Sequence, residues 1–202
     1  MAKECEVKFF LTDVKNIQKH LLVAGAEIIK PRVFERNLRF DFPDRSLTAA
    51  GKVLRLRQDS QIRLTYKDRA CKEDVISERE ELEIQVDDFD TAQALLSALG
   101  YEVSVQYEKY RTTYLLHDVE IDLDEMPFGN FLEIEGPSAV CIQKTAEQLE
   151  LNWEARSTMS YIGLFEKLRL GGLEADQLTF GQFKEKTFTA ENFGLIPAEK
   201  EV

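Results

Sequence analysis

The sequence lacks the features by which several common classes of protein are recognised. Its 202 residues contain three cysteines, Cys5, Cys71 and Cys141, whose scattered positions argue against a disulfide framework or a zinc site. It has no run of about 18 apolar residues and no signal-like apolar segment at its start, so neither a membrane span nor secretion is expected. We therefore expect a cytoplasmic protein with no membrane partner.

Further absences narrow the chemistry. No Gly-x-x-x-x-Gly-Lys-Ser/Thr motif is present, which excludes a P-loop nucleotide site. The two histidines, His20 and His117, fall in an expected helix and an expected turn, and neither is expected to be catalytic. The net charge of −11 disfavours binding to a nucleic acid polymer, because a chain of phosphates would meet a repulsive surface. A small polyphosphate could still enter a locally basic channel.

The sequence does contain a repeated alternation of charged and apolar residues. Glu4, Glu6 and Lys8 would share one face of a first strand, and Cys5 and Val7 the other. By itself, a strand with one solvated face would show the same pattern. Six later segments repeat it, at residues 53–57, 62–67, 81–86, 109–114, 119–124 and 131–135. Seven such strands, with acids and bases grouped by type, favour one shared inner face.

These strands predict an α+β fold: a closed antiparallel eight-stranded β-barrel, or tunnel, with helices packed on its outside. Closure would give each strand an inner face and remove the sheet edges. Buried charges on this scale need pairing, water, bound ions or a ligand, so the pattern predicts a metal with a polyphosphate. The charged residues expected inside are the acids Glu4, Glu6, Glu81, Glu83, Asp122, Asp124, Glu133 and Glu135, and the bases Lys8, Arg55, Arg57, Arg63, Lys67, Lys109 and Arg111.

Capping residues and apolar periodicity predict four helices, over about residues 13–25, 90–100, 138–149 and 157–168. Ser138 is the expected cap of the third helix, and Ser157 or Thr158 that of the fourth. After Gly171-Gly172 the chain changes character and carries four phenylalanines through polar sequence. A disordered tail rarely keeps so many aromatic residues. Residues 171–202 are therefore expected to form a C-terminal extension packed on the same domain.

Several short motifs follow one another along the chain: Glu4-x-Glu6-x-Lys8, Leu54-Arg55-x-Arg57, Leu64-Thr65-x-Lys67, Arg79-x-Glu81-x-Glu83, Lys109-x-Arg111, Leu123-Asp124-Glu125, the segment 129–136, and Ser160-Tyr161. In this order they resemble the CYTH superfamily, the triphosphate tunnel metalloenzymes. That superfamily includes class IV adenylate cyclases, thiamine triphosphatases and inorganic triphosphatases. The resemblance predicts a CYTH-like triphosphate tunnel domain over residues 1–170. Arg39 departs from it, because an aromatic residue is common there in the family.

Phosphoryl transfer requires phosphates to be held, the leaving group to be neutralised and a nucleophile to be placed in line. Hard divalent cations prefer carboxylate oxygens, and arginines and lysines bind phosphate. One or two Mg²⁺ or Mn²⁺ ions are thus expected on Glu4, Glu6, Asp122, Asp124, Glu133 and Glu135, with Glu81 and Glu83 as additional tunnel acids. The expected phosphate-binding residues are Lys8, Arg55, Arg57, Lys67, Lys109 and Arg111, of which Lys8, Arg57 and Lys67 are the expected catalytic residues. The resemblance implies the same two-metal scheme.

Three functions remain open. The first is a metal-dependent hydrolase of inorganic triphosphate or of a small organic triphosphate. The second is a class IV type adenylate cyclase, which would convert ATP to cyclic AMP and pyrophosphate and would need a pocket for adenine and ribose. The third is noncatalytic polyphosphate binding. The sequence is compatible with a monomer or a homodimer.

Overall fold

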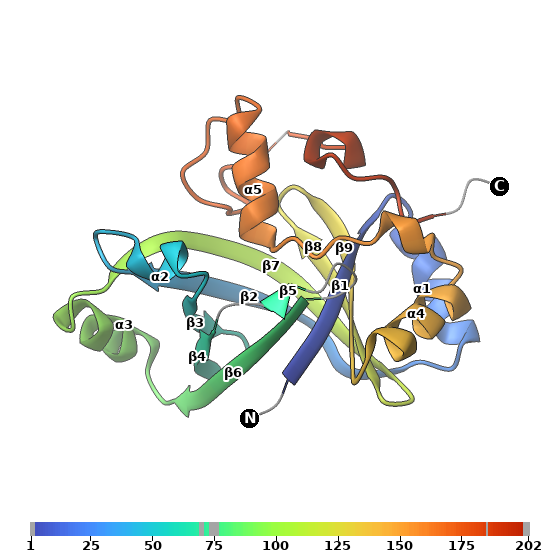
Figure 1. The fold of residues 1–202 in the computed structure, drawn as a ribbon, viewed down its shortest axis with the longest axis horizontal. Coiled ribbons are helices and arrows are strands. Elements are labelled where there is room, and N and C mark those ends of the chain that lie inside the picture. Colours follow the sequence, from blue (N-terminus) through green and yellow to red (C-terminus); the bar gives the residue numbers. More distant parts are fainter. Residues whose placement is uncertain (1–2, 69–70, 73–76, 185, 200–202) are drawn as a thin grey trace.

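One antiparallel sheet runs through the whole molecule (Figure 1). The computed structural model describes residues 3–68, 71–72, 77–184 and 186–199. The strands are β1 Lys3–Leu11, β2 Glu27–Asp41, β3 Val53–Gln58, β4 Ile62–Lys67, β5 Cys71–Lys72, β6 Ser77–Val86, β7 Glu102–Leu116, β8 Val119–Met126 and β9 Gly129–Gly136. The α-helices are α1 Val14–Val23, α2 Ser46–Ala49, α3 Phe89–Ala98, α4 Ala139–Gln148 and α5 Tyr161–Leu170. Two short 3₁₀ helices, η1 Trp153–Ala155 and η2 Ala190–Phe193, complete the described elements. The fold is α+β, as predicted.

The prediction of a closed eight-stranded barrel is wrong. Over the described residues, the sheet has nine strands in the order β1-β9-β8-β7-β2-β3-β4-β6-β5. β1 also pairs with β6, but only between residues 3–6 of β1 and 77–80 of β6, and the rest of β6 runs away from β1 (Figure 1). Further along β1, Ser157 takes the edge instead: Lys8 N donates to Ser157 O at 2.8 Å, and Ser157 N donates to Lys8 O at 2.7 Å. The sheet therefore wraps around an interior without closing along its length.

The helices begin where short polar side chains can cap them. Asp13 and Ser138 accept hydrogen bonds from the first turns of α1 and α4, as predicted. The cap of α5 is Ser160, not Ser157 or Thr158, because Ser157 stays extended to pair with β1. Helix α3 starts one residue before the expected Asp90, with Asp88 as its cap. Among the described residues, no helix is both long and apolar enough to cross a membrane.

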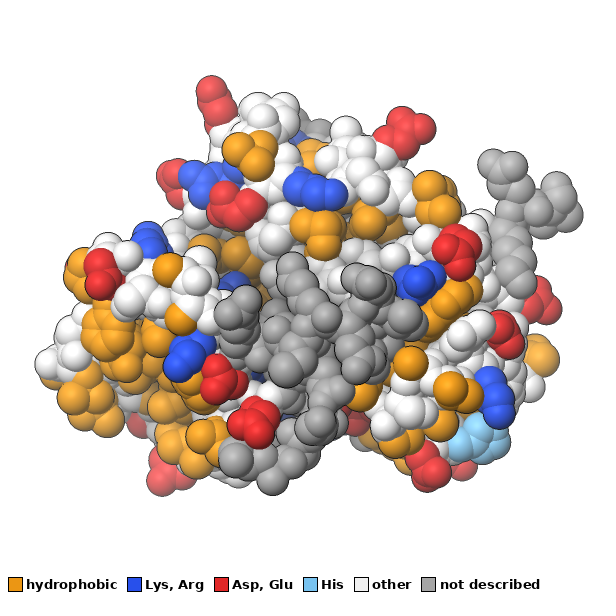
Figure 2. All heavy atoms as spheres, viewed as in Figure 1, with side chains coloured by type: hydrophobic (Ala, Val, Ile, Leu, Met, Phe, Trp, Pro, Cys, Tyr) orange, Lys and Arg blue, Asp and Glu red, His pale blue; other side chains and the backbone are white. Residues whose placement is uncertain are grey.

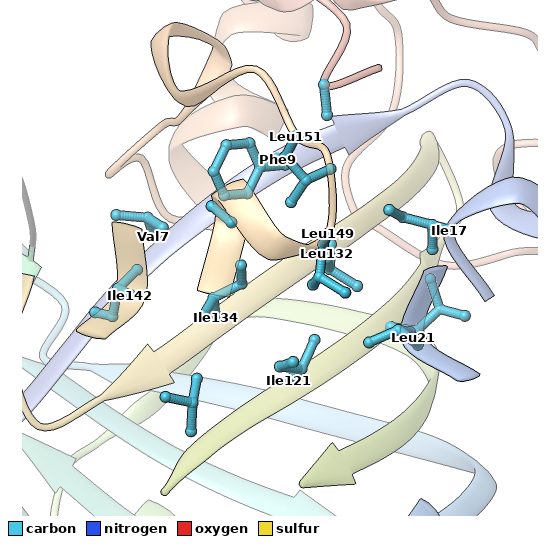
Figure 3. Close-up of a cluster of buried hydrophobic side chains, with 14 of the residues drawn as sticks. Val7, Phe9, Ile17, Leu21, Ile121, Leu132, Ile134, Ile142, Leu149 and Leu151 are labelled. Carbon is cyan, nitrogen blue, oxygen red and sulfur yellow. The ribbon is translucent and has the colours of Figure 1, made fainter. Parts of the chain in front are cut away.

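The outer face of β1, β8 and β9 packs against α1 and α4. Figure 3 shows this core, in which Val7, Ile121 and Ile134 from the strands meet Leu21 and Ile142 from the helices. All five side chains are buried. The apolar half of each alternating strand thus forms a dry layer, as the two-residue period predicted, and the charged half faces the other way.

The outer face of β2, β3, β4 and β6 is covered less completely. Helix α3 packs Phe89 and Leu96 against Leu38 and Leu56. Beyond this contact the sheet keeps exposed aliphatic side chains, including Ile84 on β6, which is 60% exposed. Figure 2 shows hydrophobic side chains gathered over this α3 end of the molecule.

The C-terminal extension packs on α5 and on one end of the sheet. Phe183 and Phe193 are buried in a cluster with Phe10, Phe131 and residues of α5. Phe10 and Phe131 continue the inward rows that hold charged residues further along β1 and β9. The inner face therefore has two zones, a charged one and an aromatic plug that the extension completes. The domain boundary at residue 170 remains a prediction.

Candidate functional site

The charged zone of the inner face surrounds a cavity of about 520 Å³. Strands β1, β2, β3, β4, β6, β7, β8 and β9 all contribute to its wall. Thr158, Ser160, Tyr161 and Ile162, around the start of α5, line it as well. Most of the charged residues predicted to face inward from separate strands therefore meet around one space.

On the β1 and β9 side, two carboxylates share one ammonium group. Lys8 Nζ donates to Glu6 Oε1 at 2.9 Å and to Glu133 Oε1 at 3.2 Å. Burial raises the pKa of Glu6, and the neighbouring charge of Glu133 adds to this effect. Burial would raise the pKa of Glu133 too, but Lys8 and Arg111 hold it well below its usual value. A pair of close carboxyls with opposite pKa shifts is suited to binding a cation, because a cation would relieve their repulsion.

Arg111 of β7 gathers the acids of β8. Its guanidinium donates to both Asp124 oxygens, at 2.6 and 2.5 Å, and to Glu133 at 3.0 Å, and it also contacts Asp122. Lys109 Nζ adds a 3.1 Å bond to Asp124. Burial raises the pKa of Asp122 to about 6, although Arg111 opposes the shift. Asp122 and Asp124 therefore lie behind Arg111, and neither is among the residues that line the cavity.

Tyr161 brings α5 into the same network. Its hydroxyl donates to Asp124 Oδ2 at 2.7 Å, and its ring lies 5.4 Å from Lys8 Nζ and 5.5 Å from Lys109 Nζ. Burial raises the pKa of Tyr161 well above its ordinary value, and the charges of Asp124 and Glu133 raise it further. The hydroxyl is therefore a fixed hydrogen-bond donor, and both ammonium groups are held against an aromatic face.

The β3 and β4 side is rich in arginine and looser. Arg57 approaches Glu35, Asp59 and Glu83 at 3.9, 3.8 and 3.7 Å, which are ion-pair distances but too long for hydrogen bonds. Burial lowers the pKa of Arg57, and the nearby charge of Arg55 lowers it further. Among the described residues, the buried Nε atoms of Arg55, Arg57 and Arg63 have no hydrogen-bond partner. This wall therefore brings several guanidiniums together at the cavity and keeps buried N–H donors without a partner among the described residues.

Not every predicted residue stands where it was expected. Those that line the cavity are Glu6, Lys8, Arg55, Arg57, Arg63, Lys67, Glu81, Glu83, Lys109, Arg111, Glu133 and Glu135. Lys67 is paired with Glu81 at 2.7 Å, and Glu83 accepts from Thr65 at 2.8 Å. The side chain of Glu4 lies outside the part of the chain that the structure describes. Arg39, the residue that departs from the family pattern, also lines the cavity.

Glu35 is a member of the site that the sequence did not single out. It is 2% exposed, and its carboxylate lies 3.5 Å from Lys109 Nζ. Burial would raise its pKa, but Lys109, Arg111 and Arg57 lower it to about 2. Its place could have been found from register, because Glu35 stands two and four positions before Asn37 and Arg39 on the same strand face.

The donor set fits a hard divalent cation in its chemistry. Glu6, Glu133 and Glu135 offer carboxylate oxygens at one side of the cavity, which is the ligand type that Mg²⁺ and Mn²⁺ prefer. Within the described residues, however, no three acidic, histidine or cysteine side chains already converge as a metal site. Lys8 now occupies the position between Glu6 and Glu133. Metal binding would require this ammonium to give way.

Comparison with known proteins places the chain in a family. The sequence model of the CYTH domain matches residues 2–170. The chain is 29% identical over 139 residues to the adenylate cyclase CyaB of Aeromonas hydrophila, covering 65% of this chain and 67% of that protein. A Vibrio parahaemolyticus structure aligns over 81% of this chain and 97% of its own, with 23% identity and a TM-score of 0.71. A Hippeastrum protein, reported to have a dominant triphosphatase activity, aligns over 86% of this chain and 97% of its own, with 17% identity and a TM-score of 0.63. The two structural likenesses concern the fold alone. This chain belongs to the CYTH domain family.

Proposed function

We propose that this protein is a divalent-metal-dependent triphosphatase, which cleaves inorganic triphosphate or a small organic triphosphate bound in the charged cavity. The observation that carries the proposal is the unfilled donor capacity of the arginine-rich wall. The buried Nε atoms of Arg55, Arg57 and Arg63 lack partners among the described residues. A buried donor left unpaired costs about 1–3 kcal/mol, and a phosphate oxygen would satisfy it.

The electrostatics of the wall support the same ligand. Burial and the like charges of Arg55, Arg63 and Arg111 disfavour the charged form of the Arg57 guanidinium. The acids near Arg57 lie at ion-pair distance but too far away for hydrogen bonds. A bound polyanion would relieve this repulsion. Several guanidiniums on neighbouring strands suit a chain of phosphoryl groups better than one isolated phosphate, because each phosphate oxygen can accept from a different donor.

The opposite wall would hold the metal. In this proposal Glu6 and Glu133 would be its principal ligands, with Glu135 nearby, and such an ion would supply charge neutralisation for the phosphates and a water of lowered pKa. Asp122 and Asp124 act indirectly, because their ion pairs with Arg111 fix that guanidinium at the cavity surface. They were expected to bind metal from the sequence, and their pairing favours this supporting role.

The lysines and arginines of the cavity would then have separate roles in phosphoryl transfer. Arg55, Arg57 and Lys67 hold the phosphates from the β3 and β4 side. Lys109 and Arg111 hold them from β7. Lys8 stands between the acids and the cavity, where its ammonium group can neutralise the leaving phosphate once a cation binds the carboxylates. Hydrolysis needs only held phosphates, an ion and a water placed in line.

Cyclisation of ATP is the second candidate, and the relation to the Aeromonas adenylate cyclase favours it. Noncatalytic polyphosphate binding is the third. The experiment gives the purified protein Mg²⁺ or Mn²⁺ together with inorganic triphosphate, thiamine triphosphate or ATP, and measures phosphate, pyrophosphate and cyclic AMP. Phosphate release that stops on chelation is the expected result. Cyclic AMP as the main product would reject hydrolysis, and tight binding without turnover would favour a binding role.

A further inference from the structure

A buried amide lies beneath the arginine-rich wall of the cavity. Asn37 of β2 is 0% exposed, yet neither its Oδ1 nor its Nδ2 atom has a hydrogen-bond partner among the described residues. Most buried polar groups in folded proteins are hydrogen-bonded, and one that is left unpaired lowers the stability of the fold. The amide of Asn37 therefore costs stability in the structure described above, which favours a role for it in another state of the site.

The strand register places Asn37 on the cavity side of the sheet. Glu35 and Arg39, two residues before and two residues after it, both line the cavity. Its cross-strand partners are Arg57 on β3 and Tyr107 on β7, which line the cavity too. Side chains that stand directly opposite in an antiparallel pair lie within reach of each other. Asn37 itself does not line the cavity, so it can act on a ligand only through these neighbours.

Two of the neighbours carry unpaired atoms that are complementary to the amide. Arg57 Nε, a donor, and Glu35 Oε2, an acceptor, also have no hydrogen-bond partner in the part of the chain that the structure describes. The Asn37 amide offers one acceptor, Oδ1, and one donor group, Nδ2. Burial would raise the pKa of Tyr107, but the charge of Arg55 lowers it, so the Tyr107 hydroxyl already has a cationic neighbour. The natural partners of the amide are therefore Arg57 and Glu35.

The guanidinium of Arg57 is free to turn toward the amide. Its nitrogens lie 3.7–3.9 Å from carboxylate oxygens of Glu35, Asp59 and Glu83, and among the described residues it makes no shorter contact with an acid. A phosphate that binds an arginine commonly takes two of its nitrogens in one bidentate contact. When these are the terminal nitrogens, Nε remains, and it is the guanidinium nitrogen closest to the backbone. It then faces the neighbouring strand, where Asn37 lies.

We propose that Asn37 is a positioning residue for Arg57. When a phosphate binds to the guanidinium, Asn37 Oδ1 accepts a hydrogen bond from Arg57 Nε, and Asn37 Nδ2 donates one to Glu35 Oε2. The amide then ties the guanidinium to a buried carboxylate and holds it toward the ligand. Because these bonds form only in the liganded state, they strengthen binding at the expense of the stability of the free protein. The inference rests on the proposed function, since it requires a phosphate on the arginine-rich wall.

The first measurement is the stability of the free protein. Asn37→Leu removes both polar atoms at similar volume, and Asn37→Ala removes them without adding any group that could clash. We expect Asn37→Leu to raise the thermal midpoint by about 2–4 °C, because an unpaired buried amide is lost. The matched control is Thr65→Val. Thr65 is equally buried but its hydroxyl donates to Glu83 at 2.8 Å, so its loss should lower the midpoint.

The second measurement is a double-mutant cycle on kcat/KM with Mg²⁺ and the best of the three triphosphates. Asn37→Leu should lower kcat/KM about tenfold in the wild type and less than about twofold in Arg57→Ala, where no guanidinium remains to be positioned. Lys67→Ala provides the control background. Lys67 lies opposite Val53 and Glu81, away from Asn37, so the tenfold loss should persist there.

Equal losses in the Arg57→Ala and Lys67→Ala backgrounds would overturn the inference. So would a larger fall in the thermal midpoint for both Asn37 variants than for Thr65→Val, and Asn37→Ala enters the cycle if Asn37→Leu does not fold. If no triphosphate is turned over, the proposed hydrolase has failed, and the cycle is measured by calorimetric affinity for inorganic triphosphate with Mg²⁺. A tenfold loss of affinity that disappears in Arg57→Ala supports the inference. Additive losses, or no binding to the wild type, reject it.

Discussion

The two walls of the cavity differ in how completely their charges are paired. On the β7, β8 and β9 wall, Arg111 reaches Asp124 and Glu133 at 2.5 to 3.0 Å, so every partner is within hydrogen-bond distance. On the β3 and β4 wall, Arg57 has acids only at 3.7 to 3.9 Å. The first wall is complete without a ligand. The second retains buried donors that a bound anion would satisfy, and we therefore propose it as the principal phosphate-binding wall.

Of the substitutions considered, removal of the Arg57 side chain from the arginine-rich wall should have the largest effect on activity. We expect Arg57→Ala to lower kcat for the best triphosphate by about 10³-fold, because a guanidinium that holds transition-state charge contributes on that scale. The thermal midpoint should change little, since the variant also removes a buried cation that burial and like charges destabilise. Steady-state kinetics and thermal unfolding measure the two effects.

The control is Arg36→Ala, on the opposite face of β2. Arg36 lies over the Phe89 ring, 4.7 Å from its centre, and does not line the cavity. Its activity should stay near that of the wild type. Near-wild-type turnover in Arg57→Ala would remove this guanidinium from the site.

The outer faces of the two walls predict a second contrast, in stability. Ile134 of β9 is fully buried beneath α4, whereas Ile84 of β6 is 60% exposed. Ile134→Ala should lower the free energy of unfolding by about 2–5 kcal/mol, because it leaves a cavity in a packed core. Ile84→Ala should change it by less than about 0.5 kcal/mol. Denaturant unfolding of both variants measures the difference, and similar losses would mean that the outer face of β6 is covered in solution.

Glu35 joins the two walls, and its contribution should depend on pH. Its pKa is about 2 in the folded protein, against an ordinary value of 4.5, so its charged form stabilises the fold by about 3 kcal/mol at neutral pH. A lowered pKa means that this stabilisation is present above about pH 4.5 and is lost as the pH falls toward 2. Glu35→Gln should therefore be less stable than the wild type at pH 6, with a difference that shrinks by pH 3. Urea unfolding at several pH values tests this, and a difference independent of pH would contradict it.

Much of the site could be predicted because alternation along a strand is a local property. The side chains of Glu6, Lys8, Arg57 and Lys109 face inward for the same reason that Val7 packs in the outer core. Barrel closure was predicted wrongly because it depends on which segment pairs with the edge of β1. Ser157 does so from a position far along the chain, and nothing local marks it.

Register and ion pairing were also beyond the sequence. The bulges of β2 shift register against β7, and Pro31 is their only local sign. Asp124 alternates with Asp122 along β8, as two metal ligands on one strand face would, yet it is fully buried behind Arg111. The partners of Asp124 come from β7 and from α5. Alternation along one strand cannot predict which residues of other elements will lie beside it.

The smallest expected effect on activity concerns Tyr161, which links the β7, β8 and β9 wall to helix α5 and so to the C-terminal extension. Tyr161 donates to Asp124, and its helix is held from behind by Phe193 and by Lys167, which donates to the Phe193 carbonyl at 2.8 Å. Tyr161→Phe keeps the ring beside Lys8 but removes the hydroxyl. We expect kcat to fall roughly tenfold with little change in KM, because the loss acts on the orientation of Asp124 and Arg111 and leaves Arg55 and Arg57 on the opposite wall in place.

The matched control is Tyr114→Phe, since Tyr114 is also buried but belongs to the core on the outer face. It should leave both kinetic constants unchanged. Equal effects of the two substitutions, or a change in KM alone, would show that Tyr161 only fills space. A loss of kcat confined to Tyr161→Phe would instead mean that the Tyr161 hydroxyl, by its hydrogen bond to Asp124, helps to orient Asp124 and Arg111.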